Sequence, residues 1–369
     1  MIISFIIYSF VIGMTYVISQ NCYANYTFTN KNRSKMPFTV MVVISLLFVF
    51  YNYYVTTLTG QYGGDRYNYY MNFIGRRESP SLGLTFLMNL MHRFGWNFNT
   101  LLYLTTFFCV FFSLVAYRIL EFSTPISILL LLGSQYGIYN FYALKQCYAN
   151  TFAVLALAFM LKEESSRRSD ALSIICIILA IYFHDAGFVL IPIYIMGKSA
   201  SNKKAVAVSV ALLIIIMLYF RPIMLGFGRL IDPVIPGISY HINLYLNDEV
   251  NTIGEQGTLQ ILKGFPIYII TFWGWINRKY YCETFYDFDR YLFLSFCASL
   301  IYILSFYNGW IYRLIYLIAF PSDLLFGKMM EIENNKFNRI VLKIFVVGGI
   351  LFLTYRFIYL IYALNDGIF

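Results

Sequence analysis

Long apolar segments separated by short polar breaks recur along the whole chain. A helix that spans a bilayer needs about 20 mostly apolar residues, so these segments predict transmembrane or re-entrant helices. By this criterion there are about twelve segments, at residues 1–19, 38–58, 100–118, 126–143, 146–161, 171–183, 186–197, 205–221, 264–277, 291–307, 310–327 and 344–363. The pattern predicts an all-α, polytopic integral membrane protein, with a single transmembrane domain over residues 1–369 and two longer loops, 59–99 and 222–263.

The composition agrees with a membrane protein. The 369 residues are 60% hydrophobic and 12% charged, and the mean hydropathy is +0.65. Soluble globular domains carry about 25% charged residues, which excludes that class here.

Most of the 27 basic residues lie in alternate breaks between the apolar segments. Cytoplasmic loops are enriched in Lys and Arg, so these breaks are expected in the cytoplasm. They hold Lys31, Arg33, Lys35, Arg118, Lys162, Arg167, Arg168, Lys198, Lys203, Lys204, Arg278, Lys279, Arg290, Lys328, Lys336, Arg339 and Lys343. Both termini and both long loops then face outward. The net charge of +9 follows from this topology, so no nucleic-acid partner is expected.

The first segment lacks a basic start and a small-residue cleavage pattern, which predicts a retained first span.

The basic residues expected on the outer side are mostly arginines, a bias that chance in a small set would also produce. Arginine forms planar, bidentate pairs with phosphate, whereas lysine is a point charge. A site for a phosphorylated, lipid-embedded molecule would explain the bias. The arginines are Arg66, Arg76, Arg77, Arg93, Arg221, Arg229, Arg313 and Arg356.

The sequence predicts no metal and no cofactor. The six cysteines form no CxxC pair, and His92, His184 and His241 are isolated from one another. Asp287-Phe288-Asp289 spells the DxD with which many sugar-nucleotide transferases hold a metal, but it lies in a basic cytoplasmic break. Solvated loop charges are the simpler interpretation.

The break at His184 and Asp185 divides an apolar region, residues 171–197, that is too short for two full spans. Basic clusters flank both ends, and a single tilted helix would put one of them outside. The pattern therefore predicts a helical hairpin whose tip lies within the membrane. A His and an Asp at that depth are costly unless they face a polar cavity, so they are candidate functional residues; a hydrogen-bonded structural turn is the alternative.

Two further charges are expected at comparable depth. Lys145 lies in a tight turn, and Arg313 lies early in the span after Asn308-Gly309. Together with His184 they predict a basic cavity that opens outward. The alternative is that both side chains extend to the interface as anchors.

The first outer loop begins with Gly63-Gly64, which permits a sharp turn, and Asp65 could cap a short helix after it. Asp65, Tyr69 and Asn72 would share one face of that helix beside an aromatic band. The next segment, residues 81–94, is short and is expected along the outer leaflet.

The order of these features resembles the EpsG branch of the Wzy-type polysaccharide polymerases, which are similar to the GT-C class of membrane glycosyltransferases. The resemblance covers residues 50–320 and rests on Asp65 with Tyr67 and Tyr69, Glu78 before SPSLGLTFLMNLMHRFG, Lys145-Gln146-Cys147-Tyr148-Ala149, FHDAGFVLIPIY around His184, and Arg313 before Tyr316. Lys145 stands where the family usually has Arg, and an Asp after the His is less usual.

The resemblance implies polymerisation of a capsule, O-antigen or exopolysaccharide at the outer face of a bacterial inner (plasma) membrane. A glycan on a polyprenyl diphosphate would be transferred to the terminal sugar of a lipid-linked repeat unit. The partners expected are this lipid-linked oligosaccharide and the bilayer, with a chain-length regulator or a flippase as candidate protein partners. The reaction needs a base at the acceptor hydroxyl and positive charge at the leaving diphosphate.

The residues expected to do this are assigned by role. His184 or Asp65 would be the base, with Asp185 orienting His184. Lys145, Arg313 and Arg221 would bind the diphosphate. Tyr67, Tyr69, Glu78 and His241 would contact the glycan, with Asp232 and Glu249 in the second outer loop.

Two other functions use similar residues. A lipid-linked oligosaccharide flippase or transporter would also have a basic cavity, but usually shows an internal repeat, and none is evident. A membrane O-acyltransferase would use a membrane-embedded His, reached from the cytoplasm.

Overall fold

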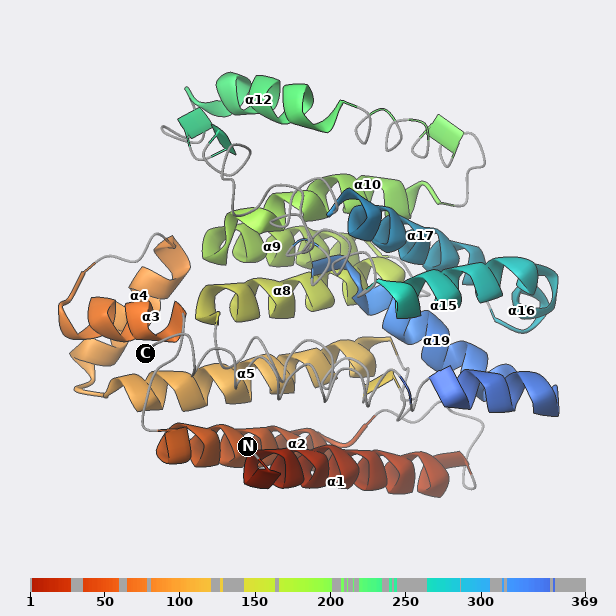
Figure 1. The fold of residues 1–369 in the computed structure, drawn as a ribbon, viewed down its shortest axis with the longest axis horizontal. Coiled ribbons are helices and arrows are strands. Elements are labelled where there is room, and N and C mark those ends of the chain that lie inside the picture. The colour runs from red at the N-terminus through yellow and green to blue at the C-terminus, as the bar shows by residue number, and fades with distance from the viewer. Residues whose placement is uncertain are drawn as a thin grey trace. The chain divides into compact units, whose positions relative to one another are not determined.

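The computed structural model describes residues 2–27, 36–59, 65–77, 81–120, 127–128, 143–162, 166–200, 207–208, 211, 215, 219–233, 239–240, 242–243, 264–285, 287–305, 314, 317–345 and 348. The regular elements in these ranges are helices, which confirms the all-α prediction (Figure 1). They are α1 (Ile2–Thr27), α2 (Phe38–Thr59), α3 (Asp65–Ile74), α4 (Leu82–Arg93), α5 (Phe98–Ile119), α8 (Leu144–Leu161), α9 (Arg167–Phe183), the 3-10 turn η2 (Asp185–Val189), α10 (Leu190–Lys198), α12 (Phe220–Ile231), α15 (Phe265–Ile276), α16 (Arg278–Thr284), α17 (Phe288–Leu304) and α19 (Phe320–Ile332).

The chain folds as two compact units, which we call unit 1 and unit 2. Unit 1 comprises Met1–Leu190 and Phe326–Phe369, and unit 2 comprises Ile191–Leu325. Unit 1 contains α1 to α9 and η2, and unit 2 contains α12, α15, α16 and α17.

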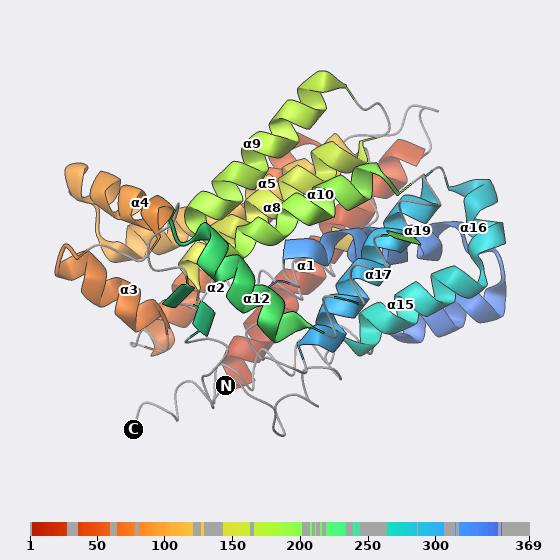
Figure 2. The same cartoon turned by 90° about the horizontal axis from the view of Figure 1, so that it is seen from above.

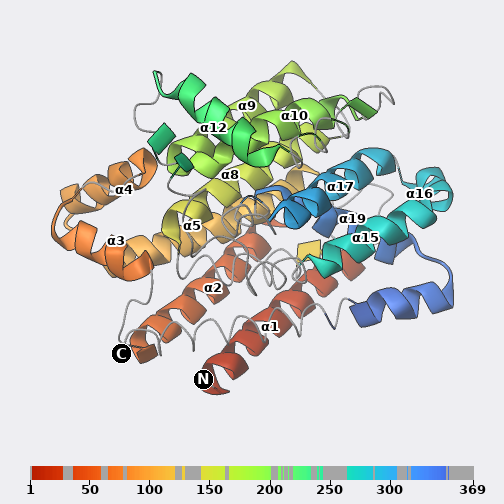
Figure 3. The ribbon, with the colours of Figure 1, turned by 45° about the horizontal axis from the view of Figure 1, so that its top comes forward.

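The long helices of unit 1, α1, α2, α5, α8 and α9, lie side by side (Figures 1 and 3). Aromatic contacts join neighbours: the rings of Tyr8 and Tyr51 are 5.3 Å apart between α1 and α2, and those of Phe108 and Tyr148 are 5.3 Å apart between α5 and α8. These large rings fill the spaces between the helices and hold the stack together.

Small residues let α8 and α9 approach closely. Ala153 and Ala156 of α8 and Ser173 and Ala180 of α9 are buried, and the Ser173 hydroxyl donates to the carbonyl of Ala156 at 2.8 Å. Contacts of this kind replace the hydrophobic effect between helices in a membrane. The start of α9 is fixed by a capping box between Ser166 and Ser169.

The two short helices α3 and α4 lie at one end of α5 in all three views (Figures 1 to 3). The sequence predicts a short helix from Asp65 and a short segment at 81–94, and both are confirmed. Ser81 is the N-cap of α4, because its side chain accepts a hydrogen bond from the amide of Leu84.

In unit 2, α15 and α17 pack together (Figure 2). The hydroxyl of Thr271 on α15 lies 2.8 Å from that of Ser295 and 3.1 Å from that of Ser299 on α17. This buried hydroxyl cluster satisfies polar groups that would otherwise be costly in an apolar environment.

Two helices of the described chain are long and apolar enough to cross a membrane, Phe98–Ile119 and Leu144–Leu161. Shorter apolar helices cover Ile6–Gln20, Phe38–Tyr54 and Phe265–Ile276. Several predicted spans, among them 126–143, 205–221 and 344–363, fall wholly or largely outside the described residues. The number of spans and the likeness to the GT-C class therefore stay predictions.

Candidate functional site

A hydrophobic cluster draws the ends of four helices of unit 1 together. It is formed by side chains of α3, α4, the first turns of α5, and the first residue of α8: Tyr69, Phe73, Leu84, Met88, Met91, Phe98, Leu101, Leu102 and Leu144. Because Leu144 belongs to this cluster, its neighbour Lys145 lies at the same end of unit 1. Asp65, one helical turn before Tyr69, begins α3 there as well.

The C-terminal end of α9 joins the same group of helix ends. The hydroxyl of Ser81, at the start of α4, donates to the carbonyl of Phe183 at 2.7 Å. A Cβ at Gly83 would lie 2.7 Å from the ring of Phe183, so only glycine permits this approach. The same ring stacks on Tyr148 of α8, with centroids 4.6 Å apart. His184, the next residue, is therefore held beside α4 and α8.

The predicted break at His184 is confirmed. His184 is both the C-cap of α9 and the N-cap of η2, and its Nδ1 accepts a hydrogen bond from the amide of Ala186 at 3.0 Å. Gly187 folds back onto α9, where a Cβ would lie 2.6 Å from the amide nitrogen of Ile181. Since the Nδ1 lone pair accepts this bond, the neutral ring carries its proton on Nε2.

Asp185 does not have the role expected of it. Its side chain is exposed and, among the described residues, makes no hydrogen bond or ion pair with His184. The amide of Ala186 orients the ring instead. An N-capping turn does not need a carboxylate partner, and it is the hydrogen-bonded structural turn that the sequence left open as the alternative.

A buried arginine fixes the start of α3. Arg66 is only 3% exposed, and its Nη2 donates to Oδ1 of Asn52 on α2 at 3.0 Å. The Nδ2 of Asn52 donates in turn to the hydroxyl of Thr106 on α5 at 2.6 Å. This network positions the first turn of α3, where Asp65 lies, on two long helices. From the sequence, Arg66 was expected only as one of the outward arginines. The polar Asn52 within an apolar segment was the signal for this network.

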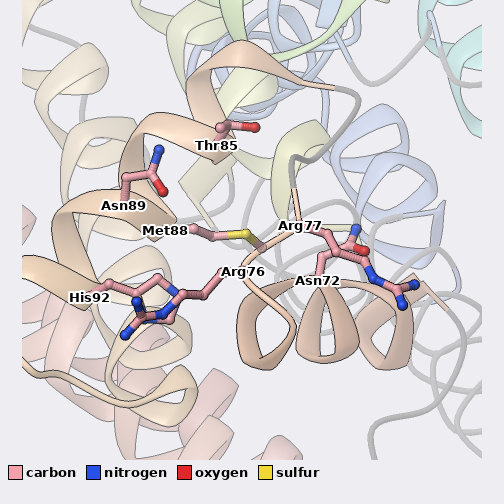
Figure 4. A pocket seen from close by; sticks show the side chains of 7 residues that line it. All are labelled: Asn72, Arg76, Arg77, Thr85, Met88, Asn89 and His92. Atoms are coloured by element: carbon pink, nitrogen blue, oxygen red, sulfur yellow. The ribbon is translucent and has the colours of Figure 1, made fainter.

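A pocket lies between the C-terminal end of α3 and the exposed side of α4 (Figure 4). It is a small hollow that is open to solvent, with about 240 Å³ of space when the solvent at its mouth is counted. It is lined by Asn72, Arg76, Arg77, Thr85, Met88, Asn89 and His92. The Nε2 of His92 lies 3.0 Å from the carbonyl of Phe73, and the two rings stack at 4.2 Å. The adjacent pair Arg76-Arg77, directly after a predicted helix, was the sequence signal for this pocket.

The residues expected in the site divide into three groups. Asp65, Tyr67, Lys145 and His184 come together at one end of unit 1, with Lys145 and His184 partly buried and Tyr67 52% exposed. Tyr69 is also there but only 4% exposed, so its ring packs in the core instead of facing a ligand. Of the other five, Asp185 is described above, Glu78, His241 and Arg313 are outside the described residues, and Arg221 belongs to α12 of unit 2, with its backbone alone described.

Each carboxylate of the DxD sequence is paired with an arginine side chain. Nε and Nη2 of Arg278 each donate to Asp289 at 2.6 Å, and Nη1 of Arg290 lies 3.4 Å from Asp287. The hydrogen bonds to Asp289 raise the pKa of Arg278 above its ordinary value. Within the described residues no group of His, Cys, Asp or Glu side chains could hold a metal. Both aspartates lie at the start of α17 and not within a loop, and each is paired with an arginine of unit 2.

Comparison with known proteins gives one informative match. No curated protein and no solved structure matches the chain. Residues 41–369, nearly the whole chain, match the EpsG family, a Wzy-like family of polysaccharide polymerases. The family and the apolar helices together indicate a membrane protein. By this match the chain belongs to the EpsG family.

Proposed function

We propose that the protein polymerises a bacterial surface polysaccharide at the outer face of the plasma membrane. A glycan carried on a polyprenyl diphosphate is transferred to the terminal sugar of another lipid-linked repeat unit. The observation that carries the proposal is the family match over residues 41–369. It is supported by the gathering of Asp65, Lys145 and His184 at one end of unit 1.

The transfer breaks the bond between the sugar C1 and the diphosphate oxygen, and it forms a bond between C1 and the acceptor oxygen. The acceptor hydroxyl loses its proton to a base, and polyprenyl diphosphate leaves with the electron pair. The protein must therefore supply one proton acceptor near the acceptor sugar and positive charge near the leaving group.

Asp65 is the proposed base, in preference to His184. The Nδ1 lone pair of His184 already accepts from Ala186, so in this tautomer the ring offers a proton at Nε2. A donor of this kind suits a phosphate oxygen or a sugar hydroxyl. The start of α3 is fixed by the buried Arg66, which would hold the backbone of Asp65 in place.

Lys145, with Arg313 and Arg221, is proposed to stabilise the leaving diphosphate. Lys145 lies in the first turn of α8, and Ala143 before it makes no side-chain capping bond. The first amides of a helix and its positive dipole end favour an anion, and they would act together with the lysine ammonium.

Exposed aromatic and polar groups of the outer loops are proposed to hold the glycan. Tyr67 offers a half-exposed ring on which a sugar can stack. Glu78 and His241 stay in the proposal as hydrogen-bonding groups from the two long loops. Tyr69 is left out because it packs in the core.

The experiment is deletion of the gene in its native host, followed by gel analysis of surface polysaccharide and lipid-linked oligosaccharides. A lost ladder with accumulation of single repeat units supports a polymerase. Complementation with Asp65→Asn, Lys145→Ala, His184→Ala and Arg313→Ala then tests the site, with insertion checked by immunoblot. An unchanged ladder with altered acetylation would indicate an acyltransferase, and repeat units trapped in the cytoplasm would indicate a transporter.

A further inference from the structure

The end of α3 holds an arginine where a glycine would be expected. The amide of Arg77 bonds to the carbonyl of Asn72 at 2.8 Å, and the amide of Arg76 bonds to that of Phe73 at 3.2 Å. This pair of bonds is the Schellman motif, whose C′ residue adopts a left-handed conformation. Arg76 is that residue, with φ +50°, and Gly75 stands one position too early to serve.

The end of α4 shows the same motif with the usual residue. The amide of Trp96 bonds to the carbonyl of Met91 at 2.9 Å, and the amide of Gly95 bonds to that of His92 at 3.1 Å. Gly95 has φ +66° and meets no steric penalty. Both helices therefore end in the same turn. At Arg76 the left-handed conformation strains the backbone, because the residue is not a glycine. Strained residues that persist tend to cluster at ligand sites.

Arg76 lines the pocket between α3 and α4, as does Arg77. In Figure 4 the Arg76 side chain extends toward His92, and Arg77 lies beside Asn72. Among the described residues, the side chains of Arg76, Arg77, Asn72 and Asn89 make no hydrogen bond or ion pair. In Figure 4 the two arginine side chains extend in opposite directions, so they line different parts of the pocket, and the described residues supply no partner to either guanidinium group.

We propose that this pocket binds an anionic oxygen group of the lipid-linked repeat unit, a carboxylate or a phosphate. Guanidinium groups match the two oxygens of such an anion, and the amides of Asn72 and Asn89 suit neighbouring sugar hydroxyls. The proposal rests on the proposed function, because it assigns a subsite to that substrate.

The test is ligand-observed NMR with the full-length protein in lipid nanodiscs. The probes are methyl glucuronide for a sugar carboxylate, geranyl diphosphate for a lipid head group, and methyl glucoside as the neutral control. We expect one or both anionic probes to bind at least tenfold more tightly than the glucoside. The anion that binds identifies which part of the repeat unit the pocket holds.

Matched variants locate the binding. Arg76→Asn removes the charge while Asn tolerates the left-handed conformation, and Arg76→Lys keeps the charge but not the planar fork. We expect a loss of at least tenfold with Asn and a smaller loss with Lys. Arg93→Ala removes an exposed arginine of α4 that does not line the pocket, and it should bind as the unmodified protein does.

Equal binding of all three probes, no binding of either anion, or equal losses with Arg76→Asn and Arg93→Ala would each overturn the proposal. These outcomes are separate from failure of the proposed function, which is judged by the polysaccharide ladder of the deletion strain. A ladder lost on deletion, together with no anion binding, would leave the polymerase in place and remove the pocket from it.

Discussion

Arginines in two regions of the molecule meet opposite surroundings. In unit 2, Arg278 and Arg290 pair with the carboxylates of Asp289 and Asp287. In unit 1, the described contacts give the side chains of Arg76 and Arg77 no carboxylate at all. Charges that the protein itself neutralises contribute to local structure, whereas clustered charges without a partner remain available to a ligand.

Other polar groups lie at the same end of unit 1. Nδ1 of His184 accepts from the backbone amide of Ala186, Lys145 lies in the first turn of α8, and the buried Arg66 donates to Asn52. The end formed by α3, α4, α8 and α9 is the region where we expect substitutions to affect the proposed reaction.

The largest effect is expected from Asp65→Asn. The change removes the proposed base but keeps the size of the side chain, so polymer formation should fall by about 10²-fold or more. Polymerisation of purified lipid-linked repeat units, followed on a gel, measures it. Asn68→Ala, an exposed change on the same helix, is the control and should retain activity. An Asp65→Asn protein that inserts normally and polymerises at the original rate would remove Asp65 from the reaction.

The next effect separates two functions of His184. Asn is a good N-cap, so His184→Asn should keep the turn that Nδ1 makes with Ala186, while losing the donor at Nε2. We expect a loss of polymer of at least tenfold with a nearly unchanged melting temperature. His184→Ala should lose polymer and also about 1 kcal/mol of unfolding free energy. If the His184→Asn protein still makes polymer of full length, His184 has only a structural role as a helix cap.

Asn52→Ala tests the buried support of α3. It removes the oxygen that accepts from the buried Arg66, so the unfolding free energy should fall by about 1–3 kcal/mol. Thermal unfolding in detergent measures this loss. Ser45→Ala is a matched change, because the buried Ser45 hydroxyl donates only to Met41 of its own helix. Equal losses in the two variants would show that the bond to Arg66 contributes no more to the unfolding free energy than a hydrogen bond within one helix.

Hydrophobic periodicity and charge were sufficient to predict much of the secondary structure at this end of unit 1. They predicted the short helix from Asp65, the segment at 81–94 and the break at His184, and these are confirmed. Lys145 was expected in a tight turn, but it lies in the first turn of α8. Each confirmed prediction depends on local signals: an apolar run, a break in it, or a capping residue. Local signals of this kind are sufficient to place helix ends within a few residues.

The same patterns could not predict contacts between residues that are far apart in the sequence. The Asn52 to Arg66 bond and the Ser81 to Phe183 bond join segments far apart in the chain, and no spacing rule links them. Tyr69 shows the converse error: it shares a predicted face with Asp65, but the packing of α4 against α3 buries it. Helical spacing gives the direction of a side chain, and tertiary packing decides what covers it.

The smallest effect is expected from Asp289→Asn in unit 2. The Arg278–Asp289 pair is about half exposed, with side chains 52% and 45% accessible. An exposed pair contributes about 0–1 kcal/mol, so the melting temperature should hardly change, and the polymer ladder should be unaffected. Arg278→Gln breaks the same pair from the other side and should behave alike.

If Asp289→Asn alone abolished polymer while the protein inserted normally, the aspartate would have a role that its pairing with arginine does not explain. A divalent metal held with Asp287 would then become the first alternative, testable by dependence of activity on added Mn²⁺. The contrast between neutralised and available charges would fail in that case, because a paired carboxylate would have proved to be part of the reaction.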